Sequence, residues 1–431
     1  MVDPQGSVPR QFTAACASVT SMTDTRNDKP AKCPITTVAT PLDAAITALK
    51  LPEPGTALTP LEAKDLATLI ALRGLGRVAP NPLVGAVIVD NQHRFVSAGA
   101  HEKLGEAHAE VAALRAAAAA GLSQAVSGGT MYVTLEPCAH VNRTPACAPQ
   151  VAASGVARVI YGSLDPNPKV SGKGAGIINA AGIRCDSDPS WTDDCERLAQ
   201  IFLWNMRQSK PYVGLKVATS LDGIMARRGD QRAWITGPRA RAYGHFLRVY
   251  YDAILVGAGT MLADDPSLDP RDSLWPGRTP IRVVLDPRGR ALTARPNANW
   301  KILSHEPSRV LWVIGEAHAK EVETQTKMIM DVGAQVLSLP LSNDGMIAPT
   351  LILGELWKRG ITSLLLEGGL GVYRSFLDRQ CVNQIHLFQA PKLLGGGPDA
   401  MYFGDAAKSL ELGAPRLTPL GTDWLIDAAM T

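Results

Sequence analysis

Short apolar runs alternate with helical segments through most of the chain, and this alternation constrains the fold more than any other feature. Runs rich in Val, Ile and Leu between glycine or polar turns predict strands, and apolar residues at helical spacing predict helices. Strands that alternate with helices predict a layered α/β domain. The first alternation has expected helices over residues 61–76, 107–121 and 144–155 and near 177–182, and expected strands over 83–90, 94–100, 130–135 and 157–163.

Turn and cap residues refine this first alternation. The strands 83–90 and 94–100 are separated by a short polar turn, which predicts a hairpin. Gly121 is expected to end the second helix. Thr144 is the expected N-cap of the third helix, with Pro145 in its first turn.

A second alternation begins at about residue 210. Its expected helices cover 238–251 and 349–360, and its expected strands lie within 211–223, 252–260, 280–286, 309–315, 361–369 and 382–397, the last being the final strand and loop. With 431 residues, 46% of them hydrophobic, the chain has the length and apolar content for more than one core. We therefore expect an extension over 1–58, rich in Pro, Thr, Ser and Asp and disordered, and two α/β domains over 59–207 and 208–431.

Charge and hydropathy exclude several classes of protein. The 43 Lys and Arg residues against 40 Asp and Glu residues leave a net charge of +3, without a long basic run, so no nucleic-acid partner is expected. No segment reaches the roughly 18 apolar residues of a membrane span, and the N-terminus lacks the pattern of a secretory signal. The seven cysteines are odd in number and scattered, which does not indicate a disulfide framework. A cytoplasmic enzyme is expected.

Two of these cysteines, Cys138 and Cys147, stand close together in TLEPCAHVNRTPAC. Two thiolates with one imidazole make a catalytic zinc site, in which the last position is left to water. His108 is the best third ligand, because it opens a predicted helix and is followed by Glu110. Residues at i and i+2 converge only at a helix start, where the geometry is looser. The dipoles of two helix N-termini then favour the thiolates.

The chemistry of such a site follows from its parts. Zinc lowers the pKa of its bound water to about 7, and a carboxylate that is not a ligand takes that proton and passes it to a leaving amine. His-x-Glu before Pro-Cys…Cys is the arrangement of zinc-dependent base deaminases, with Glu110 as the proton shuttle. Singly, each residue is more often a surface group, a cap or a core thiol, and a purely structural zinc with a fourth protein ligand is a further alternative.

The long loop between the two cysteines, together with PNPLVGAVIV (80–89), AGAHEKLGEAHAE (98–110) and ARVIYGSLDPNPKVSGKG (157–174), resembles the deaminase domain of the bifunctional RibD family of riboflavin biosynthesis. The resemblance covers nearly all of residues 61–185 and implies a cytidine-deaminase-like αβα sandwich. It also implies a substrate pocket that uses Asn81, with His101 and His140 nearby. Val141-Asn142 departs from the usual His-Gly of the family.

In the second domain, glycines follow apolar strands in LKVATSLDG, GAGTMLADDPSL and LLLEGGLG, at the strand ends where α/β sheets bind cofactors. Such turns alone are more often simple connections, and no G-x-G-x-x-G follows the first strand. These segments, with WITGPRAR and PIRVVLD, resemble the reductase domain of the same family over about residues 211–400. That resemblance implies a dihydrofolate-reductase-like fold and NADPH as the cofactor.

The same resemblance assigns roles to residues of the second domain. Lys216 is expected close to the reacting centre, as a catalytic residue. Arginine suits a phosphate because of its fixed fork of donors. The implied cofactor contacts are Ala218, Trp234, Thr260, Asp264, Gly369, Leu370 and Gly371, and the implied contacts with the sugar phosphate are Arg248, Leu268, Arg271 and Glu367.

Two segments depart from the reductase pattern. Asp230-Gln231-Arg232-Ala233 replaces Gly-Glu-Ser-x, so that either Arg232 takes over a substrate contact or the loop is shifted. Asp269-Pro270 replaces a Thr or Asn followed by a variable residue.

The sequence thus predicts a homo-oligomeric enzyme with two activities. One zinc ion per chain and Glu110 deaminate 2,5-diamino-6-ribosylamino-4(3H)-pyrimidinone 5′-phosphate by hydrolysis, and NADPH then reduces the ribosyl side chain to the ribityl product. The alternative is a deaminase of another base, such as one in a nucleic acid, whose C-terminal module binds a nucleotide without catalysis. The long cysteine loop and the absence of a basic patch favour the first hypothesis.

Overall fold

The computed structural model describes residues 51–139, 145–166, 171–227, 234–270, 279–297, 299–406 and 409–431. The chain forms two compact units that divide between Ser209 and Lys210, so the first unit ends just beyond the expected boundary at residue 207. None of the helices in the described ranges is long and apolar enough to cross a membrane.

The first unit is built on a five-stranded sheet with the order β2-β1-β3-β4-β5. The predicted hairpin is confirmed, because β1 and β2 are antiparallel, and the remaining strands run parallel from β3 onward. Its strands are β1 (Gly85–Val89), β2 (Phe95–Ala100), β3 (Thr130–Leu135), β4 (Arg158–Ser163) and β5 (Arg184–Ser187). Its helices are α3 (Pro60–Ala71), η2 (Leu72–Gly74), α4 (Ala109–Ala119), α5 (Ser123–Val126), α6 (Cys147–Ala152), α7 (Lys173–Ala180), α8 (Pro189–Leu198) and α9 (Gln200–Gln208).

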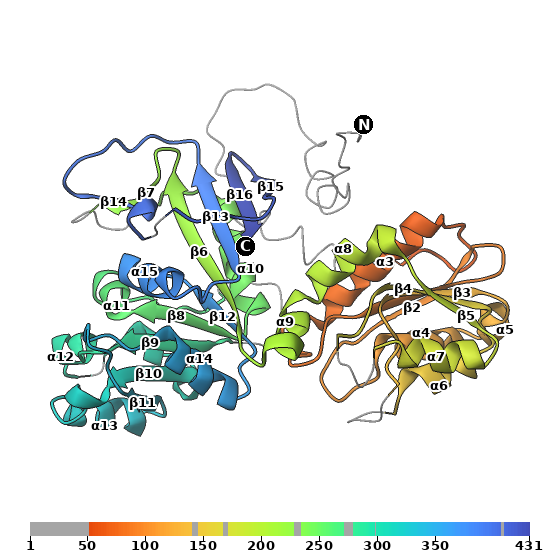
Figure 1. The fold of residues 1–431 in the computed structure, drawn as a ribbon, viewed down its shortest axis with the longest axis horizontal. Coiled ribbons are helices and arrows are strands. Elements are labelled where there is room, and N and C mark those ends of the chain that lie inside the picture. The colour runs from red at the N-terminus through yellow and green to blue at the C-terminus, as the bar shows by residue number, and fades with distance from the viewer. Residues whose placement is uncertain are drawn as a thin grey trace. The chain divides into compact units, whose positions relative to one another are not determined.

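Helices cover both faces of this sheet (Figure 1). On one face, Ala67 and Ile70 of α3 and Trp191 of α8 pack against Val87 and Tyr132 of the strands. On the other face, α4, α6 and α7 bury small and aliphatic side chains against the alternate strand residues. This arrangement is the predicted αβα sandwich.

Residues 51–58 belong to the first unit, which corrects the expectation of an extension through residue 58. Gly55 N donates to the carbonyl oxygen of Phe95 at 2.8 Å, and Phe95 N donates to that of Thr56 at 2.7 Å. Leu51 and Leu58 pack against the α3 side of the core. The segment thereby covers the start of the edge strand β2, where it satisfies both backbone groups of Phe95. Residues 1–50 lie outside the described residues.

The helix that carries Cys147 begins later than predicted. Its N-cap is Ala146 and its first residue is Cys147, so the expectation of Thr144 as the N-cap is wrong. Neither Pro145 nor Ala146 supplies a side-chain cap, and the backbone N–H of Cys147 instead donates to Cys138 Sγ at 3.3 Å. A distant sulfur therefore takes the place of the local hydroxyl cap that the sequence indicates.

The second unit is built on a nine-stranded sheet with the order β11-β10-β9-β8-β12-β6-β13-β16-β15. The strands from β11 to β13 are parallel, and β16 and β15 add an antiparallel edge. The strands are β6 (Tyr212–Ser220), β8 (Ala253–Gly257), β9 (Ile281–Asp286), β10 (Val310–Gly315), β11 (Gln335–Leu339), β12 (Ser363–Leu366), β13 (Gln384–Ala390), β15 (Arg416–Leu420) and β16 (Asp423–Ala429), and β7 (Ile224–Arg227) pairs separately with β14 (Ala400–Tyr402).

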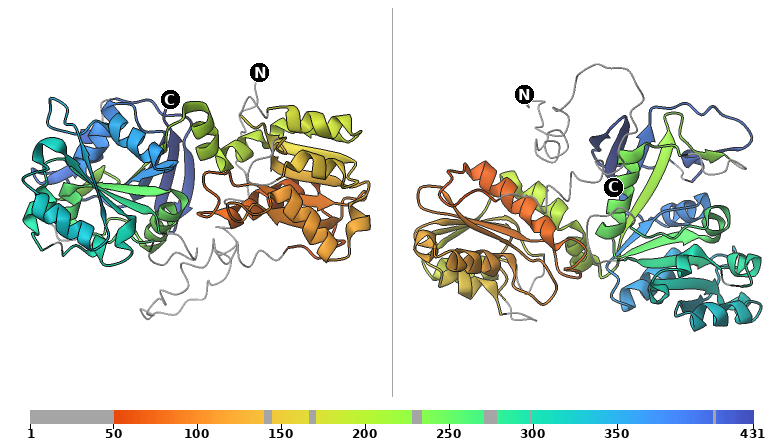
Figure 2. Two further views of the ribbon diagram at one scale, coloured as in Figure 1. Left: turned by 90° about the horizontal axis from the view of Figure 1, so that it is seen from below. Right: turned by 180° about the vertical axis from the view of Figure 1, so that it is seen from behind.

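Helices lie on both faces of this sheet as well, as the two views of Figure 2 show. Helices α14 and α15 pack on the face that presents Val213, Leu215 and Val217 of β6. Helix α10 packs on the opposite face, where Tyr243 contacts Phe388 of β13. The helices of this unit are α10 (Pro238–Tyr250), α11 (Ala258–Asp264), α12 (Arg290–Ala294), η3 (Lys301–Leu303), η4 (Pro307–Arg309), η5 (Glu316–His318), α13 (Glu323–Asp331), α14 (Pro349–Lys358), α15 (Leu370–Asp378) and η6 (Phe403–Ala406).

The strand within residues 382–397 is not the last one, contrary to the prediction. β16 pairs with β13 and β15 pairs with β16. β16 was not predicted because two of its buried positions are the carboxylates Asp423 and Asp427. Each is satisfied by a distant partner: Asp423 accepts from Gly237 N at 2.6 Å, and Asp427 contacts His386 Nδ1 at 2.5 Å.

Candidate functional site

The three predicted metal ligands of the first unit converge from three separate elements. His108 is the N-cap of α4, Cys138 follows β3, and Cys147 is the first residue of α6. Their ligand atoms all lie within 4.8 Å of one another. His108 Nδ1 lies 3.3 Å from Cys147 Sγ and 3.6 Å from Cys138 Sγ. Two sulfurs and one imidazole nitrogen at these separations form a donor set suited to zinc.

The electrostatics of this cluster favour a thiolate at Cys138. The hydrogen bond from Cys147, reinforced by His108, lowers the pKa of Cys138 to about 4 despite its burial. The same hydrogen bond and burial raise the pKa of Cys147, while the hydrogen bond with Cys138 raises the pKa of His108. One thiolate is therefore present at neutral pH, and a thiolate rather than a thiol is the form that binds metal.

Glu110 lies beside the cluster in the first turn of α4, with 3% of its surface exposed. His108 has an extended backbone at ψ 165°, and this departure from helical geometry allows its side chain and that of Glu110 to serve one site. Burial, followed by the charge of Cys138, raises the pKa of Glu110 to about 7. A carboxyl group with such a pKa both accepts and releases a proton at neutral pH.

Asn81 and His101 form a second pair at this site. Asn81 Nδ2 lies 3.1 Å from His101 Nε2, and His101 Nδ1 lies 3.2 Å from the carbonyl oxygen of Ala107. The ring of His101 is buried and stands edge-on to that of His108, with 5.0 Å between centroids. Burial lowers the pKa of His101, which favours its neutral form. His140, the other predicted neighbour, lies outside the described residues.

Glu136 is a residue of this site that sequence reasoning missed. Its carboxylate accepts from Gly172 N at 3.0 Å and from Ala175 N at 3.2 Å, so it caps α7. A Cβ atom at Gly174 would lie 1.7 Å from the carbonyl oxygen of Pro137. The start of α7 is therefore tied to the Glu136-Pro137-Cys138 segment. The signal in the sequence was the position of Glu136 two residues before a predicted ligand.

In the second unit, the structure brings together three of the predicted residues. Arg248 of α10 forms two hydrogen bonds with Glu367, which directly follows β12: Nε to Oε1 at 2.7 Å and Nη2 to Oε2 at 2.8 Å. Burial lowers the pKa of Lys216 on β6, with Glu367 opposing that effect. Burial alone would raise the pKa of Glu367, but Arg248 and then Lys216 outweigh it, and the pKa is lowered. Two cations and one carboxylate therefore share a low-dielectric environment.

Four of the predicted cofactor residues, Thr260, Gly369, Leu370 and Gly371, lie at one glycine turn. Gly369 has φ +83° and is the N-cap of α15, which begins with Leu370 and Gly371. A Cβ atom at Gly368 would lie 2.7 Å from Thr260 Oγ1, so α11 packs directly on this turn. Asp264 ends α11, and Ala218 lies on β6. Close approach of backbone and an exposed helix N-terminus are features of phosphate-binding turns.

Trp234 and Leu268 are the other predicted residues of this unit that lie in the described ranges. The side chain of Trp234 is 70% exposed, and the guanidinium of Arg241 lies 4.8 Å from the centre of its ring. Leu268 is buried with φ +57°, next to Asp269, whose carbonyl oxygen accepts from Arg248 Nη1 at 2.9 Å. Arg232 and Arg271 lie outside the described residues.

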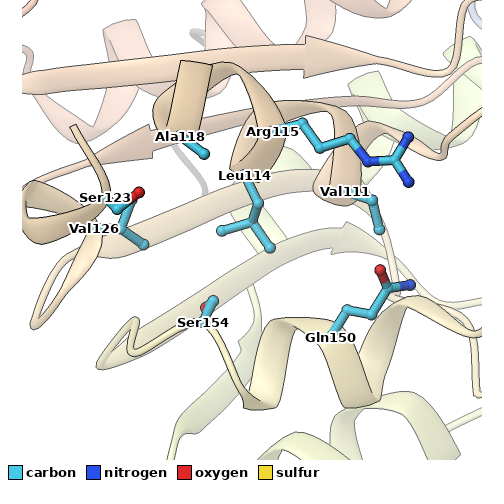
Figure 3. Close-up of a pocket in the computed structure, with 8 residues that line it drawn as sticks. All are labelled: Val111, Leu114, Arg115, Ala118, Ser123, Val126, Gln150 and Ser154. Carbon is cyan, nitrogen blue, oxygen red and sulfur yellow. The ribbon is translucent and has the colours of Figure 1, made fainter. Parts of the chain in front are cut away.

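A surface hollow of about 300 Å³ lies between α4, α5 and α6 (Figure 3). Leu114 and Val111 project from α4 toward Gln150 of α6, which faces them. Arg115, Ala118, Ser123, Val126 and Ser154 complete its lining. None of its lining residues belongs to the predicted sites, although α4 and α6 are the two helices that begin at predicted metal ligands.

Both units match known families. The model described as cytidine and deoxycytidylate deaminase zinc-binding region matches residues 62–163, and the model described as RibD C-terminal domain matches residues 211–426. The chain is 37% identical over 366 residues to riboflavin biosynthesis protein RibD of Bacillus amyloliquefaciens, which covers 83% of this chain and 93% of that protein. It is 36% identical over 345 residues to the protein of the same name from Escherichia coli strain K12, which covers 76% and 87%.

Solved structures give the same result. Acinetobacter baumannii RibD, form 1, superposes with a TM-score of 0.71 at 34% identity and covers 86% of this chain and 98% of its own. A diaminohydroxyphosphoribosylaminopyrimidine deaminase/5-amino-6-(5-phosphoribosylamino)uracil reductase from Thermotoga maritima superposes with a TM-score of 0.69 at 31% identity and covers 86% and 98%. The likeness spans both units.

Proposed function

The chain belongs to the RibD family of bifunctional riboflavin biosynthesis enzymes, with a zinc-dependent deaminase unit and an NADPH-dependent, dihydrofolate-reductase-like unit, and we propose the residues that carry out each reaction. The substrate of the first unit is the diaminopyrimidinone ribosyl phosphate named for the Thermotoga maritima relative. The product of deamination is then the substrate of the second unit.

His108, Cys138 and Cys147 hold the zinc ion. Support comes from the donor set itself, two sulfurs and an imidazole nitrogen within 4.8 Å of one another. Three protein ligands are the number that catalytic zinc sites use, with the last position open to water. When bound there, zinc lowers the pKa of water and so supplies the attacking oxygen at neutral pH.

Glu110 moves the protons of the deamination. The reaction replaces the C–N bond to the amino group by a C=O bond, consumes one water and releases one ammonia. One proton of the water must reach the departing nitrogen. A buried carboxyl group with a pKa of about 7 next to the metal ligands is able to take that proton and deliver it.

Asn81 orients the pyrimidine ring. Since His101 Nδ1 faces a carbonyl oxygen, it carries the ring proton, and Nε2 is the acceptor for the amide nitrogen of Asn81. The amide of Asn81 is thereby fixed with its oxygen on the other side, where it accepts from an amino group of the substrate. His101 acts here as a positioning residue.

The reductase site is formed by Lys216, Arg248 and Glu367. NADPH, which supplies the hydride, fits the second unit because a Cβ atom at Gly371 would meet nothing within 4 Å, so the N-terminus of α15 is open to a phosphate. We assign Ala218, Trp234, Asp264 and Leu370 to the same cofactor. As C1′ of the ribosyl group gains hydride, its bond to the ring oxygen breaks, and that oxygen takes up a proton. Lys216, whose pKa is lowered by burial, holds this proton on Nζ.

Arg248 and Glu367 bind the sugar phosphate as a unit, with Leu268 beside them. Arg248 has five N–H donors, and within the described part of the chain three of them are engaged by Glu367 and the carbonyl oxygen of Asp269, which leaves two for a ligand. The carboxylate of Glu367 accepts from sugar hydroxyls. Arg232 and Arg271, outside the described residues, are proposed as further contacts with the phosphate.

The convergence of Glu110 with the three ligands carries the deaminase assignment, and metal analysis combined with two separate readouts tests the whole proposal. Full-length protein is given the diaminopyrimidinone ribosyl phosphate, and ammonia release and NADPH oxidation are followed separately. We expect about one zinc per chain and both signals. Ammonia without NADPH oxidation would support the alternative of a non-catalytic C-terminal module.

Two cysteine variants test which cysteines bind zinc. Cys147→Ala is expected to lose zinc and ammonia release together, whereas Cys185→Ala, which changes a buried cysteine of β5, is expected to keep both. Full zinc occupancy in Cys147→Ala would remove Cys147 from the ligands.

We further propose that the chain is a cytoplasmic homo-oligomer. The five cysteines in the described ranges are all free thiols, which suits a reducing compartment. Light scattering of the purified chain determines the mass in solution, and a monomer at micromolar concentration would contradict the oligomer.

A further inference from the structure

Arg282 of β9 is a cation that the two proposed reactions do not use. Its side chain is 0% exposed, and Asp269 is the carboxylate with which it pairs, at 3.0 Å between Nη1 and Oδ1. Its Nη2 donates to the carbonyl oxygens of His305 and Glu306, each at 2.6 Å. A buried guanidinium is costly unless it is paired and hydrogen-bonded, so its position dictates where Asp269 lies.

Asp269 also reaches the proposed reductase site. Its carboxylate binds Arg282, while its backbone carbonyl oxygen accepts from Arg248 Nη1 at 2.9 Å. The other two hydrogen bonds of Arg248 among the described residues go to Glu367. Asp269 therefore links the buried guanidinium of Arg282 to Arg248, the residue that we assign to the sugar phosphate.

The loop between the two arginines is held in an unusual conformation. Leu268 has φ +57° although it is not glycine, and only 2% of its surface is exposed. Left-handed conformations of such residues persist where their surroundings over-determine them. Ser267 lies close to Arg282 as well, with 3.5 Å between its carbonyl oxygen and Nη1. Arg282 therefore contacts the loop on both sides of Leu268, at Ser267 and at Asp269.

We propose that Asp269 and Arg282 are positioning residues of the reductase: Arg282 anchors the 267–269 loop so that Asp269 aims the guanidinium of Arg248, and Leu268 beside it, at the phosphorylated sugar. This inference rests on the proposed reductase function. It assigns a role to an aspartate at which the sequence departs from the Thr or Asn typical of the family. An amide oxygen is also an acceptor for Arg282, so Asn at this position keeps the anchor, whereas a methyl group removes it.

Three variants of the full-length chain test the proposal. Asp269→Ala removes the anchor and leaves the backbone carbonyl in place, Asp269→Asn restores the acceptor, and Asp265→Ala is the control. Asp265 lies in the same loop, has φ +44° and binds Arg295 at 2.8 Å, but it makes no contact with Arg248 among the described interactions. Its loss is expected to lower the melting temperature at least as much as Asp269→Ala, because alanine disfavours a left-handed conformation.

The readouts are kcat and KM for the deaminated ribosyl phosphate, the Kd for NADPH by fluorescence titration, and the melting temperature. Asp269→Ala is expected to raise KM about tenfold, as expected when one charged hydrogen bond is misaligned, with kcat changed less than KM and the Kd for NADPH unchanged. Asp269→Asn is expected to recover most of the loss. Asp265→Ala is expected to leave KM near the wild-type value.

A KM for Asp269→Ala within twofold of wild type overturns the proposal, and so does an equal rise of KM in Asp265→Ala, because the effect would then follow stability alone. If the wild-type chain does not oxidise NADPH at all, the proposed reductase function fails instead. Calorimetric titration with the deaminated ribosyl phosphate then still decides the positioning role: weaker binding in Asp269→Ala than in Asp265→Ala supports it, and equal binding overturns it.

Discussion

The guanidinium of Arg248 and the carboxylate of Glu367 form a two-point ion pair, with 2.7 Å between Nε and Oε1 and 2.8 Å between Nη2 and Oε2. The side chains are only 15% and 5% exposed. This pair joins α10 to the end of β12 and neutralises one carboxylate with one cation, so that Lys216 supplies the remaining positive charge of the cluster. The two parallel hydrogen bonds fix the orientation of the Arg248 guanidinium relative to the carboxylate of Glu367.

Glu367→Gln is expected to destabilise the second unit by about 3 kcal/mol at neutral pH, because it leaves the buried cation of Arg248 without its partner. The pKa of Glu367 is lowered in the folded chain, so its contribution to stability is fully present above the unfolded value near 4.5 and is lost as the pH falls through the folded value. The difference between variant and wild type should therefore shrink in acid. Calorimetric melts at pH 7 and at acid pH measure it.

Glu355→Gln is the control for this prediction. Glu355 also pairs with two cations, Lys358 at 2.7 Å and Arg359 at 2.6 Å, but on the surface of α14. Exposed pairs of this kind contribute little. Equal losses in the two variants at pH 7 would show that the burial of the Arg248–Glu367 pair has no energetic consequence.

Glu110→Gln is expected to retain zinc and to lower the rate of ammonia release by a factor of about 10² to 10⁴, the usual contribution of a general acid–base group. Glutamine fills the same buried space but carries no transferable proton. Ammonia release, zinc content and NADPH oxidation with the deaminated intermediate are measured side by side, and the last is expected to be unchanged. Glu106→Gln, in which an exposed glutamate nearby is changed, is the control. Unchanged turnover in Glu110→Gln would falsify the proton-shuttle role.

Local patterns in the sequence predicted the parts of the fold that depend on local order. The apolar runs became β1 to β4 of the first unit, and the convergence of His108 and Glu110 was predicted from the looser geometry of a helix start. Pairings between residues far apart in the chain could not be predicted, even where the residues themselves, such as Arg248 and Glu367, were expected at a site. Arg248 and Glu367 are 119 residues apart in the chain, and Asp423 lies 186 residues from the amide that it caps.

Two predictions that depended on polar residues failed, because the partners that decide the structure there are distant in the chain. In isolation, Asp423 and Asp427 look like loop residues, and their strand β16 was missed. Thr144 is a good N-cap by type, but the sulfur of Cys138 takes the N–H of Cys147, and α6 begins there. The ligand set thus overrides the local signal.

Gly368→Ala is expected to weaken NADPH binding, whereas Gly354→Ala, in α14 (Pro349–Lys358), is expected to change it little. A Cβ atom at position 368 would lie 2.7 Å from Thr260 Oγ1 and 3.1 Å from its Cγ2, so either the turn or α11 must move. At Gly354 a Cβ atom would meet nothing within 4 Å, and this glycine belongs to neither proposed site. Fluorescence titration gives the Kd for NADPH without turnover. Equal affinity in the two variants would argue that the turn does not contact the cofactor.

Gly174→Ala and Gly176→Ala form the sharpest matched pair, because both lie in α7 and differ only in what surrounds them. At Gly174 a Cβ atom would lie 1.7 Å from the carbonyl oxygen of Pro137, next to the proposed ligand Cys138, while at Gly176 it would meet nothing within 4 Å. Alanine is favoured over glycine in a helix by up to about 1 kcal/mol, so Gly176→Ala should be neutral or stabilising.

Gly174→Ala must instead push α7 away from the Glu136-Pro137-Cys138 segment, and both hydrogen bonds of Glu136 to this helix should weaken. We therefore expect Gly174→Ala to lower the melting temperature of the first unit and to bind zinc more weakly in competition with a chelator, and Gly176→Ala to hold zinc like the wild type. If Gly174→Ala lost stability but kept its zinc affinity, the contact with α7 would support the fold without shaping the metal site.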